Sequence, residues 1–227
     1  MKLPEKAVSR SYQNNADVVV RMQRHRLVAV VRAQSSDQAY RIACAASDAG
    51  IYFVEITFTV PDALGVIERL ALRNDLYVGA GTVLSKKDGK QAIEAGASFV
   101  VAPSLELDLI PLCHKAGVAC FPGAATPTEI LTAHRRGADL VKIFPADLVG
   151  GPYFIKQMQG PFPDVRFMVS GGVSLANVQE YVQIGVTGIC LGSAYLGSLL
   201  AEKGSGGFAD EIKEFIKRVE EAQAQAV

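Results

Sequence analysis

The sequence contains few of the residues that build metal centres or disulfide frameworks. It has no tryptophan, three histidines and four cysteines in 227 residues. His25, His114 and His134 are scattered without metal-ligand spacing, which argues against a histidine-based metal site, although carboxylates could still hold a hard cation. The cysteines form no C-x-x-C pair and are typical of reduced core thiols in a cytoplasmic protein.

An excess of charge and a long apolar run are also missing. Lys plus Arg and Asp plus Glu each number 23, so the formal net charge is zero. A neutral chain without a basic run is a poor candidate for nucleic-acid binding, and any anionic ligand must be held by a local site. We find no signal-peptide pattern and no apolar run approaching the roughly 20 residues that cross a bilayer. We therefore expect a cytoplasmic protein that has neither a nucleic-acid nor a membrane partner.

What the chain does have is a regular alternation of short apolar runs with amphipathic segments. The runs are continuous and rich in Val, Ile and Phe, as in parallel strands covered on both faces. Eight such units in about 200 residues predict an α/β fold, a (β/α)8 TIM barrel forming one domain over residues 1–227. An open doubly wound sheet is the alternative, but the first strand is followed by "RAQSSDQA", which has no glycine. The expected strands are Leu27–Val31, Tyr52–Thr57, Leu76–Ala80, Ser98–Ala102, Val118–Phe121, Asp139–Phe144, Val165–Val169 and Thr187–Leu191.

Segments at the two ends of the chain add to this barrel. Residues 1–25 precede the first strand and are expected to form a helix across the bottom of the barrel. Near the other end, Ile212, Phe215, Ile216 and Val219 have the i, i+3, i+4, i+7 spacing of a final helix. The segment "EKGSGGF", 202–208, is predicted to be a flexible loop before it.

Lys142 lies inside the sixth apolar run, where a lysine is unusual. Because side chains alternate along a strand, Leu140, Lys142 and Phe144 share one face, and the β-branched Val141 and Ile143 suit the helix side. Lys142 then points into the barrel. There it is either a salt-bridged structural lysine, a side chain that reaches water at the barrel mouth, or a nucleophilic amine favoured by burial.

Glu55 occupies the same kind of position in the second run, "YFVEIT". Phe53, Glu55 and Thr57 share its inward face. Strands two and six lie opposite each other in an eight-stranded barrel, and inward residues of even-numbered strands share layers. Glu55 and Lys142 should therefore meet, either as a buried ion pair or as a nucleophile with a proton-transfer carboxylate.

Glycine-rich turns follow three of the expected strands. "GAGTVL" places Thr82 after two glycines, which would let a ligand approach the backbone closely. "SGGVS" and "LGSAYL" follow strands seven and eight, the place where barrels commonly bind phosphate through backbone N–H groups. Simple tight turns are the alternative. The pair of turns favours a phosphate site at Gly171, Gly172, Gly192 and Ser193.

Together, these motifs resemble the 2-keto-3-deoxy-6-phosphogluconate and 4-hydroxy-2-oxoglutarate aldolase family. The resemblance rests on "VEIT", "GAGTVL", "FPGAATPTE", "VKIFPA", "GPFPDVRF" and "SGGVS", in the order and spacing of the family, over roughly residues 27–200. It implies a class I aldolase that needs no metal or cofactor and is expected to be a homotrimer. Its substrates would be a phosphorylated keto acid, cleaved to pyruvate and glyceraldehyde 3-phosphate, or 4-hydroxy-2-oxoglutarate, cleaved to pyruvate and glyoxylate.

The resemblance also assigns roles to individual residues. Lys142 matches the Schiff-base lysine, Glu55 the acid/base glutamate and Thr82 the pyruvate-binding threonine. The remaining substrate contacts would be Pro103, Phe144, Ser170, Gly171, Gly172, Gly192 and Ser193, the last four holding phosphate.

Two positions depart from the family pattern. Many members have an arginine four residues after the glutamate, where it holds the substrate carboxylate, and this chain has Thr59. The carboxylate would then depend on Thr82, backbone amides and Thr59 itself. Ser170 stands where many members have threonine, and it keeps the hydroxyl. Both changes bear on the choice of substrate more than on the reaction.

Three other functions fit part of the pattern. A 2-keto-3-deoxy-6-phosphogalactonate aldolase would use the same residues on an epimeric substrate. A phosphosugar isomerase or epimerase would share the two phosphate-binding turns, but an inward lysine facing a glutamate argues against it. A non-catalytic sugar-phosphate sensor would not need that pair.

Overall fold

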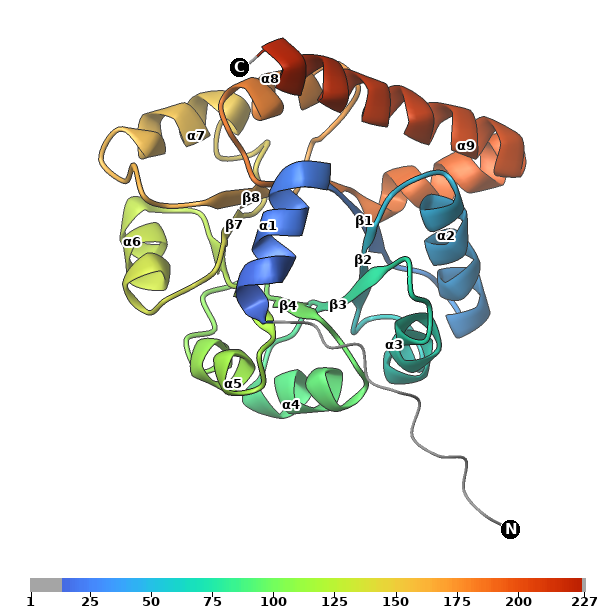
Figure 1. Cartoon of the computed structure of the whole chain (residues 1–227), viewed down its shortest axis with the longest axis horizontal. Helices are drawn as coiled ribbons and strands as arrows, with labels where there is room; N and C mark the ends of the chain where they lie inside the picture. Colours follow the sequence, from blue (N-terminus) through green and yellow to red (C-terminus); the bar gives the residue numbers. More distant parts are fainter. Residues whose placement is uncertain (1–13, 226–227) are drawn as a thin grey trace.

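The computed structural model describes residues 14–225, which form a ring of parallel strands surrounded by helices (Figure 1). Every strand pairs with its neighbours in parallel, in the order β5-β4-β3-β2-β1-β9-β8-β7-β6. The strands are β1 (Leu27–Val31), β2 (Phe53–Thr57), β3 (Tyr77–Gly81), β4 (Phe99–Val101), β5 (Ala119–Phe121), β6 (Gly123–Ala124), β7 (Val141–Ile143), β8 (Phe167–Val169) and β9 (Gly188–Leu191).

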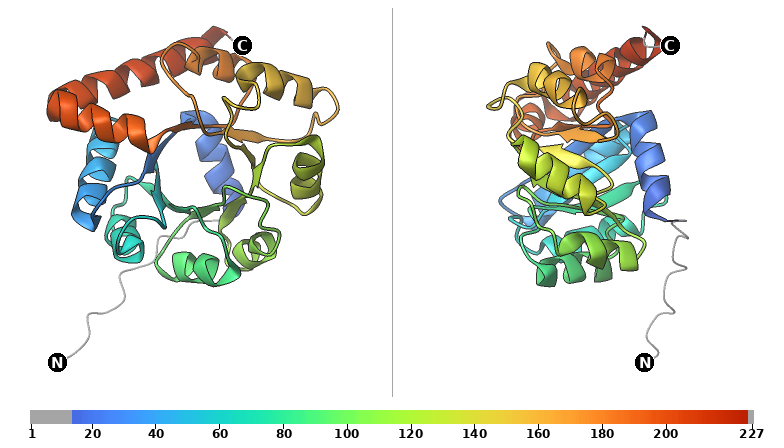
Figure 2. Two further views of the ribbon diagram at one scale, coloured as in Figure 1. Left: turned by 180° about the vertical axis from the view of Figure 1, so that it is seen from behind. Right: turned by 90° about the vertical axis from the view of Figure 1, so that its left-hand side faces the viewer.

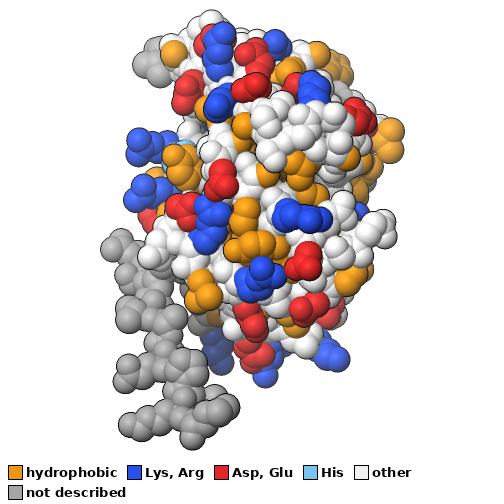
Figure 3. All heavy atoms as spheres, turned by 90° about the vertical axis from the view of Figure 1, so that its right-hand side faces the viewer, with side chains coloured by type: hydrophobic (Ala, Val, Ile, Leu, Met, Phe, Trp, Pro, Cys, Tyr) orange, Lys and Arg blue, Asp and Glu red, His pale blue; other side chains and the backbone are white. Residues whose placement is uncertain are grey.

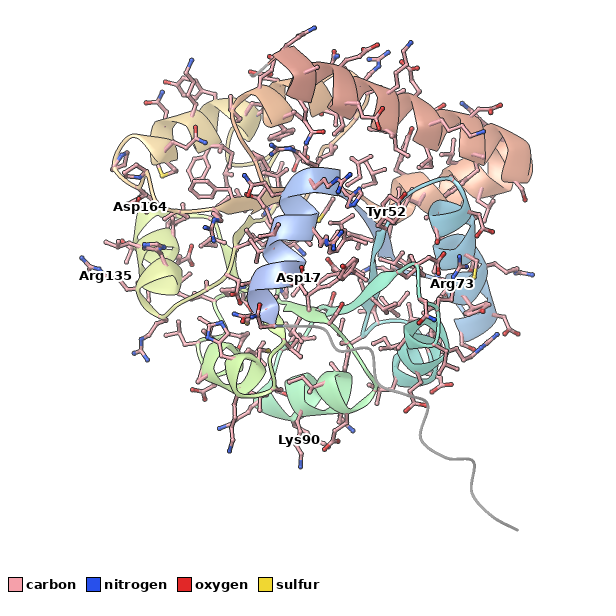
Figure 4. All side chains as sticks on the ribbon, in the orientation of Figure 1. Asp17, Tyr52, Arg73, Lys90, Arg135 and Asp164 are labelled. Atoms are coloured by element: carbon pink, nitrogen blue, oxygen red, sulfur yellow. The ribbon has the colours of Figure 1, made fainter. Side chains whose placement is uncertain are left out.

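Helices follow the strands and cover the outside of the ring. They are α2 (Ser36–Asp48), α3 (Ala63–Ala71), α4 (Lys86–Glu94), α5 (Leu109–Lys115), α6 (Pro127–Arg135), α7 (Gly151–Gln159), α8 (Val178–Gln183) and α9 (Ser193–Gln225). The labelled charged side chains of Lys90 and Arg135 project away from the barrel axis (Figure 4). The face made by α2, α3 and α9 carries charges of both signs interspersed with apolar side chains (Figure 3). The ring of parallel strands covered by outer helices confirms the predicted TIM barrel.

The predicted fifth strand, Val118–Phe121, matches β5, and a short strand that was not predicted, β6, follows Pro122. Strand β5 pairs with β4, and β6 pairs with β7. Proline has no N–H group to donate, so it interrupts the ladder, although its carbonyl still accepts from the backbone N–H of Lys142 at 2.9 Å. Counted by position around the ring, β5 and β6 form one strand of an eight-stranded barrel.

Helix α1 (Asn15–His25) lies across one end of the barrel, at the N-terminal ends of the strands (Figures 1 and 2). Val18, Val19 and Met22 are buried and pack on side chains from the inside of the barrel, among them Phe53 and Phe99. The predicted helix at the bottom of the barrel is thus confirmed for residues 15–25, while residues 1–13 lie outside the described part of the chain.

The interior above α1 is filled by aromatic rings. Phe53 stacks on Tyr77 with ring centroids 4.7 Å apart, and Phe99 stacks on Phe121 at 5.6 Å. The rings of Phe53, Phe99 and Phe121 are fully buried. They form an apolar floor under the polar residues that lie nearer the C-terminal ends of the strands.

The end of the chain differs from the expectation in the length of the break between helices. Residues 202–208 were expected to form a flexible loop before a last helix; in the structure these residues are helical except at Gly204, whose φ of 64° and ψ of −175° are not helical and separate two helices within α9. Phe208 is buried against the core, which holds the segment down. Gly204 therefore marks the boundary between the two helices, and the loop predicted before the last helix is reduced to a break at this residue.

Candidate active site

Lys142 and Glu55 lie on the inner faces of β7 and β2, strands on opposite sides of the barrel. Lys142 Nζ is 3.8 Å from Glu55 Oε1, and the two side chains are only 6% and 1% exposed. The meeting of the two residues that strand alternation predicts is therefore observed in the structure. Their separation is that of an ion pair rather than of a hydrogen bond.

The Glu55 carboxylate is incompletely satisfied. Its Oε2 atom is buried and has no hydrogen-bond partner among the described residues. Buried polar atoms are nearly always paired, and an exception calls for a functional or structural reason. A carboxylate held beside an amine with one oxygen free is suited to exchange protons with a bound molecule.

The "GAGT" motif makes room for this carboxylate. A Cβ atom at Gly81 would overlap the Glu55 carboxylate, and one at Gly79 would overlap the ring of Phe99. Neither position can carry a side chain unless its neighbour moves. The glycines here serve the packing of the barrel interior as well as the turn that follows.

Two further side chains surround the amine. The Lys142 Nζ atom lies 5.4 Å from the centroid of the Phe144 ring, a cation–π distance, and Phe144 is 38% exposed at the barrel mouth. Cys190 on β9 is fully buried, and burial, followed by the charge of Glu55, raises the pKa of its thiol to about 12. Cys190 therefore presents an uncharged thiol to the Lys142–Glu55 pair. Sequence reasoning grouped it with the other core thiols, although alternation along β9 would have indicated its inward position.

Thr82 follows β3 with an unusual backbone. Its φ is +56°, in the left-handed region that a β-branched residue rarely adopts. Such strain is concentrated at functional sites, where the surrounding structure holds it in place. Thr82 is half-buried directly beyond Gly81, and hence close to Glu55 at the barrel mouth.

Two other predicted contacts lie at this end of the barrel. Pro103 follows β4 and its carbonyl packs so closely on Gly123 that a Cβ atom there would overlap it. Thr59 is exposed in the loop after β2, and its Oγ1 lies 2.8 Å from Oγ1 of the buried Thr57.

The two glycine–serine turns follow neighbouring strands. Gly171 and Gly172 follow β8 with φ of 107° and 68°, and Gly192 and Ser193 follow β9, with Ser193 the first residue of α9. Strands β8 and β9 pair directly, so the turns lie side by side. The first N–H groups of a helix have no partner within it and favour anions.

The loop after Lys142 braces the first of these turns. The buried Ser170 accepts a hydrogen bond from Ala146 N at 2.8 Å through its carbonyl and donates its own N–H to Ile143 O at 3.1 Å. Asp147 packs so tightly on the turn that a Cβ at Gly172 would overlap it. Sequence reasoning missed Asp147, whose contact with a turn in another unit has no local signal.

One groove lies away from these candidate residues. A groove of about 660 Å³ between α2 and α9 is lined by residues such as Arg41 and Cys44, and none of the candidate residues borders it. Residues 14–225 contain no group of three or more His, Cys, Asp or Glu side chains placed to hold a metal ion. None of their helices is both long enough and apolar enough to cross a membrane.

Comparison with known proteins places this barrel in a class of lyases. A sequence model of the KDPG and KHG aldolases matches residues 18–208, and the chain belongs to that family. The 2-dehydro-3-deoxy-phosphogluconate aldolase of Pseudomonas aeruginosa is 37% identical over 172 residues, which are 75% of this chain and 78% of that protein.

Solved structures agree with this assignment. The 2-keto-3-deoxy-6-phosphogluconate aldolase of Zymomonas mobilis, crystallised with 3-phosphoglycerate, superposes with a TM-score of 0.77 at 29% identity, covering 87% of this chain and 94% of that one. A KDPG aldolase of Legionella pneumophila, with pyruvate captured as a covalent carbinolamine, gives a TM-score of 0.72 at 25% identity, covering 91% and 96%. The family identified from the motifs is confirmed, and with it the enzyme class, a class I aldolase.

Proposed function

We propose that this aldolase cleaves a 2-keto-3-deoxy-6-phospho sugar acid to pyruvate and glyceraldehyde 3-phosphate, with Lys142 as the Schiff-base nucleophile. The observation that carries this proposal is the buried pair itself, with Lys142 Nζ 3.8 Å from a Glu55 carboxylate that has one free oxygen. A structural ion pair would be expected to satisfy both carboxylate oxygens.

The reaction begins at the keto carbon of the substrate. The neutral Lys142 amine attacks C2, and the resulting carbinolamine loses water to form an iminium ion. Glu55, directly or through one water molecule, removes the proton from the C4 hydroxyl. The C3–C4 bond breaks, glyceraldehyde 3-phosphate leaves, and the electron pair of the bond becomes the enamine.

The second half of the reaction returns the enzyme to its starting state. Glu55 returns the proton to C3 of the enamine, which restores the iminium ion. Water adds to C2 and Lys142 departs, releasing pyruvate. One carboxylate can serve each step because it is alternately deprotonated and protonated.

The glycine–serine turns would hold the phosphate. Gly171, Gly172, Gly192 and Ser193 would offer backbone N–H groups at the ends of neighbouring strands. Binding energy from this remote group would orient the keto end over Lys142. Thr82, Pro103 and Phe144 would surround the pyruvate end.

Two other keto acids would fit the same site. The epimeric 2-keto-3-deoxy-6-phosphogalactonate, or 4-hydroxy-2-oxoglutarate as a source of pyruvate and glyoxylate, would use the same residues. An isomerase or epimerase would need no amine beside Glu55. A non-catalytic sensor would need neither the buried amine nor the free oxygen.

The decisive experiment is borohydride reduction in the presence of pyruvate, followed by peptide mass spectrometry. We expect a reduced adduct on Lys142, and none on the exposed Lys156 of α7. A folded protein that binds pyruvate without forming this adduct would refute the Schiff-base mechanism. A retro-aldol panel over the three keto acids, with pyruvate release coupled to an indicator enzyme, would then rank the substrates.

We further propose that the chain works as a single-domain homotrimer in the cytoplasm. Leu148 and Tyr153, 81% and 70% exposed, are apolar side chains on the rim of the barrel that a neighbouring subunit could cover. All four cysteines are free thiols, as suits a reducing compartment. Light scattering on the purified protein would test the trimer.

A further inference from the structure

Two threonines at the end of β2 form a short chain of hydrogen bonds. Thr57, the last residue of β2, is buried and lies two positions beyond Glu55, so the two side chains lie on the same face of the strand. Its Oγ1 donates to the carbonyl oxygen of Val31 at 3.1 Å. The same Oγ1 lies 2.8 Å from the Oγ1 of Thr59.

Counting hydrogens fixes the direction of this chain. A hydroxyl has one hydrogen to donate, and a carbonyl can only accept. Because the hydrogen of Thr57 goes to Val31, the bond between the two threonines must use the hydrogen of Thr59. If Thr57 instead donated its hydrogen to Thr59, the buried Val31 carbonyl would lose the hydrogen bond from Thr57, which is unfavourable.

The consequence is a hydroxyl that offers only lone pairs to the barrel mouth. A carboxylate also offers only lone pairs, so the two groups cannot hydrogen-bond each other. This direction argues against Thr59 as the replacement for a carboxylate-binding arginine. Thr59 can accept a hydrogen bond from a donor, and the donors on a sugar acid are its hydroxyl groups.

We propose that Thr59 accepts a hydrogen bond from a hydroxyl on the aldehyde portion of the substrate and thereby selects hydroxylated over deoxygenated aldehydes. This inference rests on the proposed function, since it assigns a specificity role within that site. The substrate carboxylate is then bound by Thr82 and the backbone amides of the barrel mouth.

The test uses the synthetic direction of the reaction with two matched aldehydes. Pyruvate is combined either with glyceraldehyde 3-phosphate or with 3-phosphopropanal, which has hydrogen in place of the 2-hydroxyl. The variants are Thr59→Val, which keeps the shape and removes the hydroxyl, and Thr59→Ser, which keeps the hydroxyl. Thermal unfolding checks that each variant is folded, and Thr59 is exposed enough for both to be tolerated.

We expect Thr59→Val to lower kcat/KM for glyceraldehyde 3-phosphate by roughly 5- to 50-fold, the loss that follows from removing one well-placed partner. The value for 3-phosphopropanal should stay within about twofold, and Thr59→Ser should resemble the parent with both aldehydes. Equal losses for both aldehydes, or no loss for either, would overturn the proposal.

A second measurement separates this inference from the proposed function. Borohydride trapping of pyruvate on Lys142 needs no aldehyde, so Thr59→Val should trap pyruvate at the same concentrations as the parent. If the variant needs much more pyruvate, Thr59 acts on the carboxylate and the inference is wrong while the Schiff-base mechanism stands. If the parent itself traps none, the proposed function fails and the inference fails with it.

Thr57→Val provides an additional check on the direction of the chain. It removes the acceptor that holds the Thr59 hydrogen and leaves the Thr59 hydroxyl free to rotate. We expect the preference for the hydroxylated aldehyde to fall but to remain above that of Thr59→Val. A Thr57→Val protein with an unchanged preference would show that Thr59 needs no such orientation.

Discussion

Two carboxylates at opposite ends of the barrel differ in how fully they are bonded. Asp139, before β7 at the bottom, accepts from Asn15 Nδ2 at 2.6 Å, pairs with His114 Nε2 at 2.9 Å and accepts from Cys120 N at 2.8 Å. Glu55, towards the mouth, has Lys142 Nζ at 3.8 Å, and one of its oxygens has no hydrogen-bond partner among residues 14–225. The first carboxylate fixes α1 and α5 to the barrel, whereas the second remains available to a bound molecule.

The largest effect should come from removing the amine beside the free carboxylate. Lys142→Met should lower the retro-aldol kcat by at least about 10⁴-fold, because it removes the amine that forms the iminium ion. Stopped assays of pyruvate release measure it, and circular dichroism checks the fold. Lys156→Met, on the exposed face of α7, is the matched control and should keep parental activity.

Replacing the Glu55 carboxylate should block turnover and leave Schiff-base formation with pyruvate intact. Glu55→Gln removes proton transfer but keeps the shape, so kcat should fall by about 10²- to 10⁴-fold. Borohydride should still trap pyruvate on Lys142. Turnover close to that of the parent would show that another group carries the proton.

The fully bonded carboxylate should respond in the opposite way. Asp139→Ala removes the acceptor of three donors and should lower the free energy of unfolding by about 2–3 kcal/mol. The kcat of the folded fraction should be unchanged, because Asp139 lies below the aromatic floor. Urea unfolding and steady-state kinetics would measure the two effects, and a large fall in kcat would break the comparison.

A carboxylate at the mouth end that accepts three hydrogen bonds sharpens the comparison, because it shows whether bonding or position decides the effect of a substitution. Glu129 in α6 accepts from the N–H groups of Ala125 and Thr126 and from the Thr126 hydroxyl, in a complete capping box. These bonds, first that of the Ala125 N–H, lower the pKa of Glu129 from its ordinary value of 4.5.

Glu129→Gln should therefore cost stability, about 0.5–1 kcal/mol at neutral pH, without changing kcat. A lowered pKa means that the stabilisation is present above the unfolded value and is lost as pH falls through the folded one. The difference between parent and variant in urea unfolding should thus shrink in acid. A difference that grew in acid would contradict the assignment of the pKa shift.

The sequence predicts the barrel and its central pair because both depend on periodic rules. Alternation along two even-numbered strands was enough to bring Lys142 and Glu55 together. The short strand β6 beyond Pro122 was not predicted, because its two residues, Gly123 and Ala124, are too few to show a strand pattern. The break at Gly204 falls inside the predicted loop, but its short length could not be predicted, because it depends on the burial of Phe208 against the core.

The residues that sequence reasoning missed act through contacts between distant units. Asp139 was counted only as the first residue of the sixth expected strand, although it collects donors from α1, α5 and β5. Cys190 looked like a core thiol, and Asp147 had no signal at all. Their roles depend on which loops and strands lie side by side, and no local pattern records that.

The placement of Lys142 and Glu55 on opposite walls has a consequence for assembly. Strands β2 and β7 are four positions apart in either direction around the ring when β5 and β6 count as one. No half of the barrel contains the pair in its working arrangement. If the chain were divided into two fragments between them, enzyme activity on mixing would report that the fragments had recombined into a closed ring.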